Sequence, residues 1–437
     1  MRIAVIGSGI SGLICARLLG RDHEVSVFEA NAWVGGHTNT VSIDLDGERQ
    51  EIDTGFIVYN ERNYPVFTRI LADLDVKTSP TSMSFSVRCD RTGLEYNGTS
   101  LNGVFAQRSN LVRPSFLWLL RDILRFNREG ADDLQRAPAS QTVGEYLDEH
   151  RYSTQFAEQY LLPMGAAIWS CPVGDFARFP IRFILEFYVN HGLLSLRNRP
   201  VWRVIQGGSQ RYVERLVEPF RDRIRLNCPV HSVHRDEMDV SVQHTGGTET
   251  FDEVIFACHS DQALRLLGDA DDLESEVLSE FPYSASTAVL HTDESVLPRR
   301  RRAWAAWNYH IPAMATGRPT VTYHMNILQR LQSHRSFLVT LNEEEAIDPD
   351  QELARFHYEH PLFTARRAEA QSRHDEVIRH RRTSFCGAYW RNGFHEDGVV
   401  SALAVCRKFG IEGWTAETTP NPIVVPASSS GASRATT

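Results

Sequence analysis

The first sign of chemistry in the sequence is a set of three glycines at fixed spacing, followed by an acidic residue. Gly7, Gly9 and Gly12 come directly after the apolar residues 3–6, and Glu29 stands 22 positions after Gly7. In such a pattern the first glycine permits a tight turn, the second lets the backbone approach a pyrophosphate, and the third lets a helix pack closely on a strand. A carboxylate at Glu29 can accept hydrogen bonds from both hydroxyls of a ribose. The pattern predicts a dinucleotide site.

The elements that must position this turn can be read from the same stretch. Residues 2–6 are expected to form a buried strand, residues 12–20 a helix and residues 24–30 a second strand. A strand, helix and strand with such short connections require a parallel pair of strands. The glycines then lie at the helix N-terminus, where free backbone N–H groups and a partial positive charge favour phosphate. The predicted fold class is α/β.

Six further motifs bear on the choice between NAD and FAD, which share the parts above. Gly35 and Gly36 follow Glu29, and DTGF stands at 53–56 after an expected hairpin that turns at Asp46-Gly47. Later motifs are VIQGGSQRYVERL, CPVHSV in an expected hairpin region that turns at Gly246-Gly247, FDEVIFACH, and FCGAYWRNGFHEDGVVSAL.

In type and order these motifs resemble the flavin-containing amine oxidase superfamily, which includes phytoene-type desaturases and protoporphyrinogen oxidase. The resemblance implies FAD, bound throughout catalysis, in a Rossmann-like domain of the glutathione-reductase type. It assigns to the cofactor Gly7, Gly9, Ile10, Ser11, Gly12, Glu29, Ala30, Gly36, His37, Thr38, Gly55, Phe56, Val230, Gly387, Asp397, Gly398 and Val399. His37 departs from the family pattern, because arginine is usual at that position near the pyrophosphate.

The motifs also divide the chain into two interleaved domains. The expected ranges are 1–76, 203–275 and 381–412 for the FAD-binding domain, and 77–202 and 276–380 for an α+β substrate domain. Residues 60–200 have a mostly helical pattern. Residues 413–437 are rich in Pro, Ser and Thr, so we expect a disordered tail.

A narrower resemblance points to a substrate. The stretches LEYNGTSLNG, GAAIWSCP and CGAYWRNGFHEDGV resemble a bacterial branch of predicted FAD-dependent oxidoreductases. Members of that branch are often associated with cyclopropane-fatty-acid-synthase-like methyltransferases, which implies lipid acyl chains as substrates. We therefore expect a desaturase or dehydrogenase that acts on a hydrophobic, fatty-acyl or lipid substrate.

Two other functions stay open. The first is an oxidase of small amines. Amine oxidases usually have a lysine in the substrate domain that holds a water near the flavin, whereas residues 78–407 contain no lysine. A carbon–carbon desaturation does not need that lysine. The second is a flavoprotein that binds lipid or a partner without turning over a substrate.

The catalytic candidates lie in the last motif, near the expected position of the flavin ring. His395 is a candidate general acid or base, because histidine is the residue most often used in that role. Tyr389 and Trp390 are candidates for the wall of the substrate cavity, although packing of a helix–loop junction explains either residue equally well. Cys386 does not occupy the known position of a covalent flavin link, so a small buried cysteine is the favoured interpretation.

Composition limits the partners. A net charge of −9 argues against broad nucleic-acid binding, which needs a basic face. The seven cysteines have no metal-ligand spacing, so no metal site is expected, and their odd number suggests a reducing compartment. We see no signal peptide and no apolar stretch of about 20 residues that could span a bilayer, so we expect a cytoplasmic protein.

One segment bears on membranes. Residues 105–126 combine an apolar face with arginines in the pattern of a basic amphipathic helix. Packing of a substrate-domain helix against the core is the favoured interpretation. Peripheral contact with a membrane surface, opening a channel for lipid, is the alternative.

Overall fold

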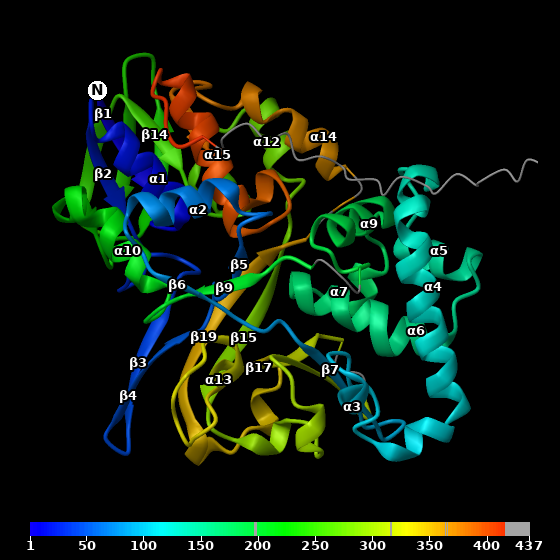
Figure 1. Cartoon of the computed structure of the whole chain (residues 1–437). Helices are drawn as coiled ribbons and strands as arrows, with labels where there is room; N and C mark the ends of the chain where they lie inside the picture. Colours follow the sequence, from blue (N-terminus) through cyan, green and yellow to red (C-terminus); the bar gives the residue numbers. More distant parts are fainter. Residues whose placement is uncertain (196–198, 315–316, 363, 365, 416–437) are drawn as a thin grey trace, which may run out of the picture.

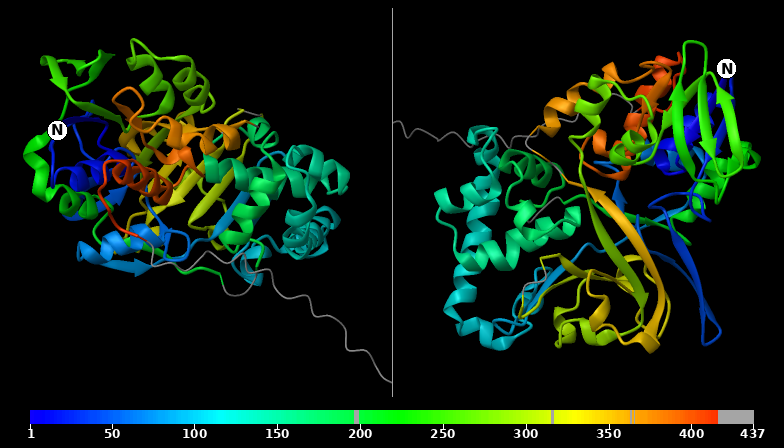
Figure 2. Two further views of the ribbon diagram at one scale, coloured as in Figure 1. Left: turned by 90° about the horizontal axis from the view of Figure 1, so that it is seen from above. Right: turned by 180° about the vertical axis from the view of Figure 1, so that it is seen from behind.

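The computed structural model describes the chain except residues 196–198, 315–316, 363, 365 and 416–437. The expected disordered tail lies almost wholly outside the described residues. A five-stranded sheet with its helices occupies one end of the molecule, and a seven-stranded sheet with a second group of helices occupies the other (Figures 1 and 2).

The five-stranded sheet is built from segments far apart in the sequence. In spatial order its strands are β10 (Ile224–Arg225), β2 (Glu24–Phe28), β1 (Arg2–Ile6), β14 (Glu253–Phe256) and β20 (Thr383–Phe385). Every neighbouring pair is parallel. Residues 3–6 of the central strand are all buried, as expected of a parallel strand with both faces covered.

Helices cover one face of this sheet. They are α1 (Ile10–Leu19), α2 (Pro65–Asp73), α10 (Gln210–Val217) and α15 (His395–Lys408). Ile3 and Val5 of β1 share a hydrophobic core with these helices. The helix predicted over 12–20 begins at Ile10, because Gly9 already serves as its N-cap.

A three-stranded antiparallel sheet and further helices cover the opposite face. These elements are β11 (Val230–Arg235), β12 (Val240–His244), β13 (Gly247–Phe251), α11 (Ser260–Leu266), α12 (Asp272–Leu278) and α14 (Arg367–Ser372). Ala4 and Ile6 of β1 face this second core. The turn expected at Gly246-Gly247 is confirmed, since His244 pairs with Gly247 across it.

The first expected hairpin is also confirmed. It consists of β3 (Thr40–Leu45) and β4 (Glu48–Asp53), with Leu45 paired to Glu48. Asp46 and Gly47 both have positive φ, 55° and 80°, as a two-residue hairpin turn of this hand requires. A separate small sheet has the strand order β5 (Tyr59–Asn60), β9 (Trp202–Ile205) and β6 (Thr78–Pro80).

The seven-stranded sheet spans the other end of the molecule. Its order is β19 (Glu352–Pro361), β15 (Tyr283–His291), β18 (Leu338–Leu341), β17 (Thr320–His324), β16 (Trp307–Ile311), β7 (Phe85–Cys89) and β8 (Leu94–Asn97). All neighbouring pairs are antiparallel except β16 and β7. The long paired strands β15 and β19 of this sheet extend toward the five-stranded sheet and so connect the two ends of the molecule (Figure 1).

Helices flank the seven-stranded sheet. They are α3 (Leu101–Val104), α4 (Pro114–Arg136), α5 (Val143–Glu149), α6 (Thr154–Phe156), α7 (Leu162–Trp169), α8 (Val173–Phe176), α9 (Ile181–Asn190) and α13 (Met325–Leu328). Short turns are η1 (Arg108–Val112), η2 (Ala157–Leu161), η3 (Glu218–Arg223), η4 (Glu294–Val296), η5 (Arg301–Ala303), η6 (Glu344–Ala346), η7 (Pro349–Gln351), η8 (His374–Glu376) and η9 (Ala388–Trp390).

Residues 105–126 are not one helix, contrary to expectation. The 3-10 turn η1 ends before Arg113, and α4 starts at Pro114, whose ring suits the first position of a helix but not its interior. Among the described residues, no helix is long and apolar enough to cross a bilayer.

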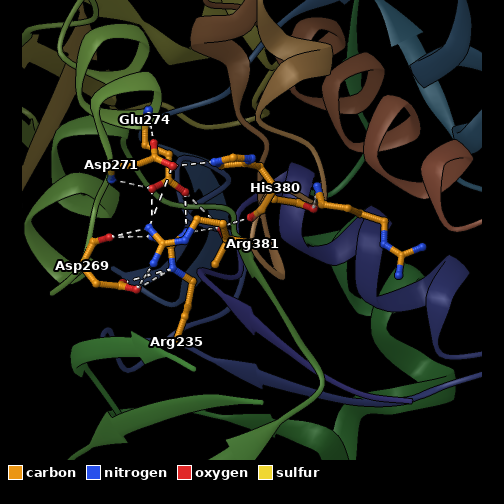
Figure 3. Close-up of polar contacts among 9 residues, drawn as sticks. Arg235, Asp269, Asp271, Glu274, His380 and Arg381 are labelled. Atoms are coloured by element: carbon orange, nitrogen blue, oxygen red, sulfur yellow. Dashed lines mark hydrogen bonds and ion pairs between the residues drawn. The ribbon is translucent and has the colours of Figure 1, made fainter. Parts of the chain in front are cut away.

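A buried ion pair ties the three-stranded sheet to the rest of the first domain (Figure 3). The guanidinium of Arg235 on β11 donates to both carboxylate oxygens of Glu274 on α12, at 2.5 and 2.8 Å, and to the Thr383 hydroxyl on β20 at 2.8 Å. The Arg235 and Glu274 side chains are 1% and 0% exposed. Asp271 is the N-cap of α12 and also accepts from His380 at 2.6 Å. This network joins three elements that are distant in sequence.

Loss of this cation is expected to destabilise the fold. The variant Arg235→Met leaves the Glu274 carboxylate buried without a cation, so the free energy of unfolding should fall by about 3–5 kcal/mol. Urea denaturation of the purified protein measures the change. As a surface control, Arg265→Met removes an exposed ion pair with Asp261 and should cost at most about 1 kcal/mol. The double variant Arg235→Met, Glu274→Leu should recover most of the loss; an undiminished loss would contradict this account.

Candidate functional site

A cavity of about 1660 Å³ lies between the two sheets and is lined by residues of both. This volume exceeds the roughly 300–1,000 Å³ of an ordinary small-molecule site. The lining falls into two parts. One, the nucleotide part, comes from the glycine turn, the end of β2, the segment after β14, the end of β19 and the start of α15. The other, the substrate part, comes from β7, β8, α3, α4, α7, α9, β16 and β17.

The glycine turn brings the N-terminus of α1 to the nucleotide part. Gly7 has φ +104°, and a Cβ there would lie 2.7 Å from the carbonyl oxygen of Ala257. A Cβ on Gly12 would lie 2.1 Å from the carbonyl oxygen of Gly7, so only glycine allows the helix to approach the turn. Gly9 caps α1 without a side-chain hydrogen bond and has open space above it. The first N–H groups of α1 therefore face the cavity, as a phosphate site requires.

Glu29 is held rigidly at the end of β2. One carboxylate oxygen accepts from the backbone N–H and hydroxyl of Ser8 at 2.9 and 2.6 Å. The other accepts from the backbone N–H and side-chain amide of Asn31, each at 2.9 Å. Because the Asn31 side chain is exposed and a carboxylate offers about four acceptor positions, ribose hydroxyls can bind Glu29 as well. Val230, at the start of β11, lines the same region.

Imidazoles surround the central region of the nucleotide part, and Arg265 of α11, paired with Asp261, lines the same cavity. The ring of His37 lies 5.1 Å from that of His360 on β19 and 5.0 Å from that of Tyr358. His259, after β14, stacks on Tyr283 and bonds Glu359 at 3.2 Å. Burial lowers the pKa of His37 well below its ordinary value and that of His360 to about 4. These histidines are therefore neutral near pH 7.

The buried nitrogens of this histidine group fit a phosphate ligand. His37 Nε2 and His360 Nδ1 are buried and have no hydrogen-bond partner within the described part of the chain. A neutral imidazole carries one N–H donor, which a pyrophosphate oxygen can accept. Sequence reasoning found His37 but missed His259 and His360. No local signal identifies His360, since β19 approaches the glycine turn only in the tertiary structure.

The N-terminus of α15 meets that of α1 at the cavity. The Ser11 hydroxyl donates to the Gly398 carbonyl at 2.9 Å, and a Cβ on Gly398 would lie 2.9 Å from side-chain atoms of Ile10 and Ser11. His395, the first residue of α15, lines the cavity. Two helix N-termini with their partial positive charges thus converge on one place.

The two carboxylates of the last motif support this junction from outside the cavity. Glu396 accepts from the backbone N–H groups of Val66 and Phe67 at 2.9 Å each and so caps α2. Asp397 accepts from the backbone N–H groups of Phe394 at 2.9 Å and Asn392 at 3.2 Å. Neither carboxylate lines the cavity. The resemblance assigns Asp397 to the cofactor. In the structure Asp397 instead holds the start of α15, and that helix start faces the cavity.

His395 belongs to a chain of polar contacts that begins at the cavity. Its Nε2 lies 2.8 Å from the Tyr212 hydroxyl, which lies 2.7 Å from the Thr38 hydroxyl. The His395 ring stacks on Phe56 with centroids 3.8 Å apart. Burial lowers the pKa of His395 to about 3, so the ring is a neutral donor and acceptor at physiological pH. The sequence did not reveal the contact with Tyr212.

The residues predicted from the sequence divide into two groups in the structure. Those that line the cavity are Gly7, Gly9, Ile10, Ser11, Glu29, Ala30, Gly36, His37, Gly55, Phe56, Val230, Gly387, Tyr389 and His395. Those that do not are Gly12, Thr38, Asp397, Gly398, Val399 and Trp390. Thr38 and Val399 are fully buried in packing around the site. Trp390 stacks instead on His374, with ring centroids 4.0 Å apart, which corrects its expected place in the cavity wall.

The substrate part is apolar and aromatic. Phe85, Tyr96, Phe187 and Trp307 contribute rings, and α4 contributes leucine and isoleucine side chains. The acidic side chains that line the cavity within the described ranges, Glu29 and Glu359, both belong to the nucleotide part. Arg199 is the charged side chain that the described residues bring to the substrate part.

The raised pKa values at the α15 junction predict that stability depends on pH. Burial raises the pKa of Glu396 to about 7 and that of Asp397 to about 6, so the folded state holds protons that the unfolded state releases. Proton binding by these two carboxyls therefore stabilises the folded state fully below their unfolded pKa values. The stabilisation is lost as the pH rises through their folded pKa values. In Glu396→Gln the decline in unfolding free energy between about pH 5 and pH 8 should shrink by about 2 kcal/mol.

Urea denaturation of wild type and Glu396→Gln at matched pH values measures this difference. The exposed Glu24→Gln serves as a control that should leave the pH dependence unchanged. An identical decline in Glu396→Gln and wild type would show that the Glu396 proton is not linked to folding.

Comparison with known proteins identifies the family. Residues 10–304 match the family model of flavin-containing amine oxidoreductases. A curated relative, an L-amino-acid oxidase of Pseudechis australis, is 22% identical over an alignment of 330 residues. The alignment covers 67% of this chain but only 57% of that relative's length.

Solved structures share the fold. A fatty acid isomerase of P. acnes that produces CLA has a TM-score of 0.67 at 15% identity, over 94% of this chain and 99% of its own. The cyclohexylamine oxidase of Brevibacterium oxydans has a TM-score of 0.63 at 15% identity, over the same shares. The family match covers more than half of the chain and agrees with the dinucleotide geometry. The chain therefore belongs to the flavin-containing amine oxidoreductase family, and its cofactor is FAD.

Proposed function

We propose that the protein dehydrogenates a long hydrophobic substrate, a fatty-acyl chain or another lipid, as a desaturase. The observation that carries this proposal is the substrate part of the cavity, which is large, apolar and without carboxylates among its described residues. Such a lining suits an alkyl chain, whose burial is favourable by about 0.8 kcal/mol for each CH₂ group.

The nucleotide part would hold FAD through backbone N–H groups, imidazoles and the Glu29 carboxylate. The N-termini of α1 and α15, Glu29 and the imidazoles of His37 and His360 would bind the ribose and the pyrophosphate. When bound, FAD supplies an acceptor for a hydride from a substrate carbon. We infer that the parallel sheet, helices and three-stranded sheet form a glutathione-reductase-type domain made of residues 1–76, 203–275 and 381–412, and that residues 77–202 and 276–380 form the substrate domain.

The chain's own residues would position the substrate and exclude water. The apolar walls from α4 and α9 would hold the alkyl chain against the start of α15. There we propose His395, whose Nε2 lies 2.8 Å from the Tyr212 hydroxyl, as the acceptor of the proton that leaves with the hydride. Burial lowers the pKa of His395 to about 3, so this role requires bound substrate to raise that pKa. That His395 acts as a base is part of the proposed function. Tyr389 lines the nucleotide part near the same helix start.

An oxidase of small amines is the alternative, and the charges of the cavity disfavour it. A protonated amine needs a carboxylate or an equivalent partner where it loses water. The described carboxylates of the lining are at the nucleotide end, and no described lining residue is a lysine. Arg199 instead suits an anionic head group, such as the carboxylate of a fatty acid. A non-turnover lipid-binding role is the remaining alternative.

The fold neighbour that acts on fatty acids supports an acyl substrate, although at 15% identity its likeness concerns the fold. The implied association with cyclopropane-fatty-acid-synthase-like enzymes stays a prediction, and so does a cytoplasmic location.

Glu29 is expected to contribute strongly to FAD affinity. The variant Glu29→Gln replaces a charged acceptor by a neutral amide, so the Kd for FAD should rise about tenfold to a hundredfold. Quenching of flavin fluorescence on titration into FAD-stripped protein measures Kd. Glu24→Gln on the same strand is exposed and should leave Kd unchanged. Equal affinity of Glu29→Gln and wild type would remove Glu29 from the site.

Substrate class is tested by anaerobic reduction of the bound flavin. Long-chain fatty acids or their esters should bleach the flavin absorbance, and mass spectrometry should find a product two hydrogens lighter. The variant Arg199→Gln should raise KM for free fatty acids about tenfold without an equal effect on their neutral esters. Arg211→Gln, on the exposed surface of α10, is the matched control. Bleaching by small amines and not by acyl chains would establish the alternative.

A further inference from the structure

Exposed apolar side chains gather where η1 joins α4, at the end of the molecule farthest from the five-stranded sheet (Figures 1 and 2). Leu111, Val112, Leu117 and Trp118 are 52%, 80%, 45% and 52% exposed. None of the four lines the cavity, so their exposure is to the outside of the protein. We refer to these four residues as the η1–α4 surface.

This surface continues into the wall of the substrate part. Leu120, Ile123 and Leu124 on α4 line the cavity, and so do residues of α3. Leu117 on the outer surface and Leu124 on the cavity wall are seven positions apart, so they lie on one stripe of the helix. Phe116 and Leu119, on another side of α4, are buried in the protein core. The apolar outer surface thus continues along one face of α4 into the wall of the apolar cavity.

Positive charge surrounds the same surface in a chain whose net charge is −9. Residues 96–121 contain no aspartate or glutamate. The arginine run 299–302 is exposed, and η5, which includes its end, packs against α3. The guanidinium of Arg121 lies 4.8 Å from the ring centre of Trp118.

Most of these arginines have no carboxylate partner among the described residues. Arg108 and Arg113 donate to neutral oxygens, those of Phe105, Asn102 and Thr92. Arg300 and Arg301 are paired with Glu95 and Glu294. Within the described residues, no ion pair engages the side chains of the remaining basic residues here, Arg108, Arg113, Arg121, Arg299 and Arg302. An exposed tryptophan and leucines with unpaired arginines around them match the apolar and basic faces of a protein that lies at an anionic bilayer.

We propose that the η1–α4 surface docks the protein on an anionic lipid bilayer and that the acyl substrate enters the cavity past α3 and α4. The docking itself is carried by the exposed apolar side chains and the arginines around them. The entry of substrate from the bilayer rests on the function proposed above. A second copy of the chain is a poorer occupant of this surface. In a symmetric dimer through this face, the unpaired arginines of one copy would lie against those of the other.

Vesicle flotation tests the docking directly. Purified FAD-loaded protein is mixed with vesicles of phosphatidylcholine alone or of an equal mixture of phosphatidylcholine and phosphatidylglycerol. The protein should float with the anionic vesicles at least about tenfold better than with the neutral ones, and high salt should release it. Absence of flotation with anionic vesicles at low salt would overturn the proposal.

Two surface variants separate the apolar and the basic contributions. The double variant Val112→Ser, Trp118→Ser should weaken partition about tenfold or more. In the double variant Arg121→Gln, Arg302→Gln, each substitution should weaken partition onto anionic vesicles about fivefold. The matched control is Leu226→Ser, Met238→Ser, which removes exposed apolar side chains just after β10 and between β11 and β12. Equal loss in the control would overturn the proposal, and so would a dimer in analytical ultracentrifugation that the surface variant dissociates.

A parallel assay with detergent-dispersed acyl substrate distinguishes this proposal from the proposed function. The surface variants should keep the FAD content and the turnover of wild type with dispersed substrate, and lose turnover only of substrate delivered in vesicles. Turnover of dispersed substrate without vesicle binding would overturn the docking and leave the function intact. Vesicle binding without turnover of any acyl substrate would support the docking and overturn the substrate entry and the function.

Discussion

The contact between the first turns of α1 and α15 is the constraint on which the rest of the site depends. Ser11 and Gly398 are 387 positions apart, yet the hydroxyl of one binds the carbonyl of the other. The approach is possible because Gly398 has no side chain, and a Cβ would collide with Ile10 and Ser11. Both helix N-termini are thereby aimed at one cavity. Glu396 extends the constraint to α2, whose first N–H groups it accepts.

The electrostatics of the nucleotide part follow from this arrangement. Its positive potential comes from helix termini and from N–H donors, while the nearby histidines are held neutral by burial. A site of neutral donors avoids the cost of burying an unpaired cation, and a dinucleotide brings the negative charge with it. The buried Glu29 carboxylate is held by hydrogen bonds from Ser8 and Asn31, and the buried cation Arg235 is paired with Glu274.

The two parts of the cavity divide the work of the molecule. The nucleotide part depends on a rigid junction of strands and helix ends from three regions of the chain. The substrate part depends on apolar side chains from helices such as α4, which have the cavity on one side and solvent on another. Substrate choice can therefore be set by α3, α4 and α9 without disturbing the FAD site. Under the proposed function, the same helices link that choice to the surface that we propose docks on a bilayer.

The sequence alone determined the local parts of this protein. The strand, glycine turn, helix and Glu29 lie within 30 residues, and the hairpin at Asp46-Gly47 closes over a two-residue turn, so spacing and residue type were sufficient. The cofactor and the family followed from motifs whose order along the chain is itself readable.

The tertiary structure decided the contacts between distant residues. It brought His360 on β19 to His37, joined His395 to Tyr212, placed Trp390 against His374 and divided the segment 105–126 at Pro114. These outcomes depend on sheet order and on which helix faces meet. Local patterns record that a residue is buried or exposed, but not which distant residue it meets, because packing partners are chosen by the whole fold.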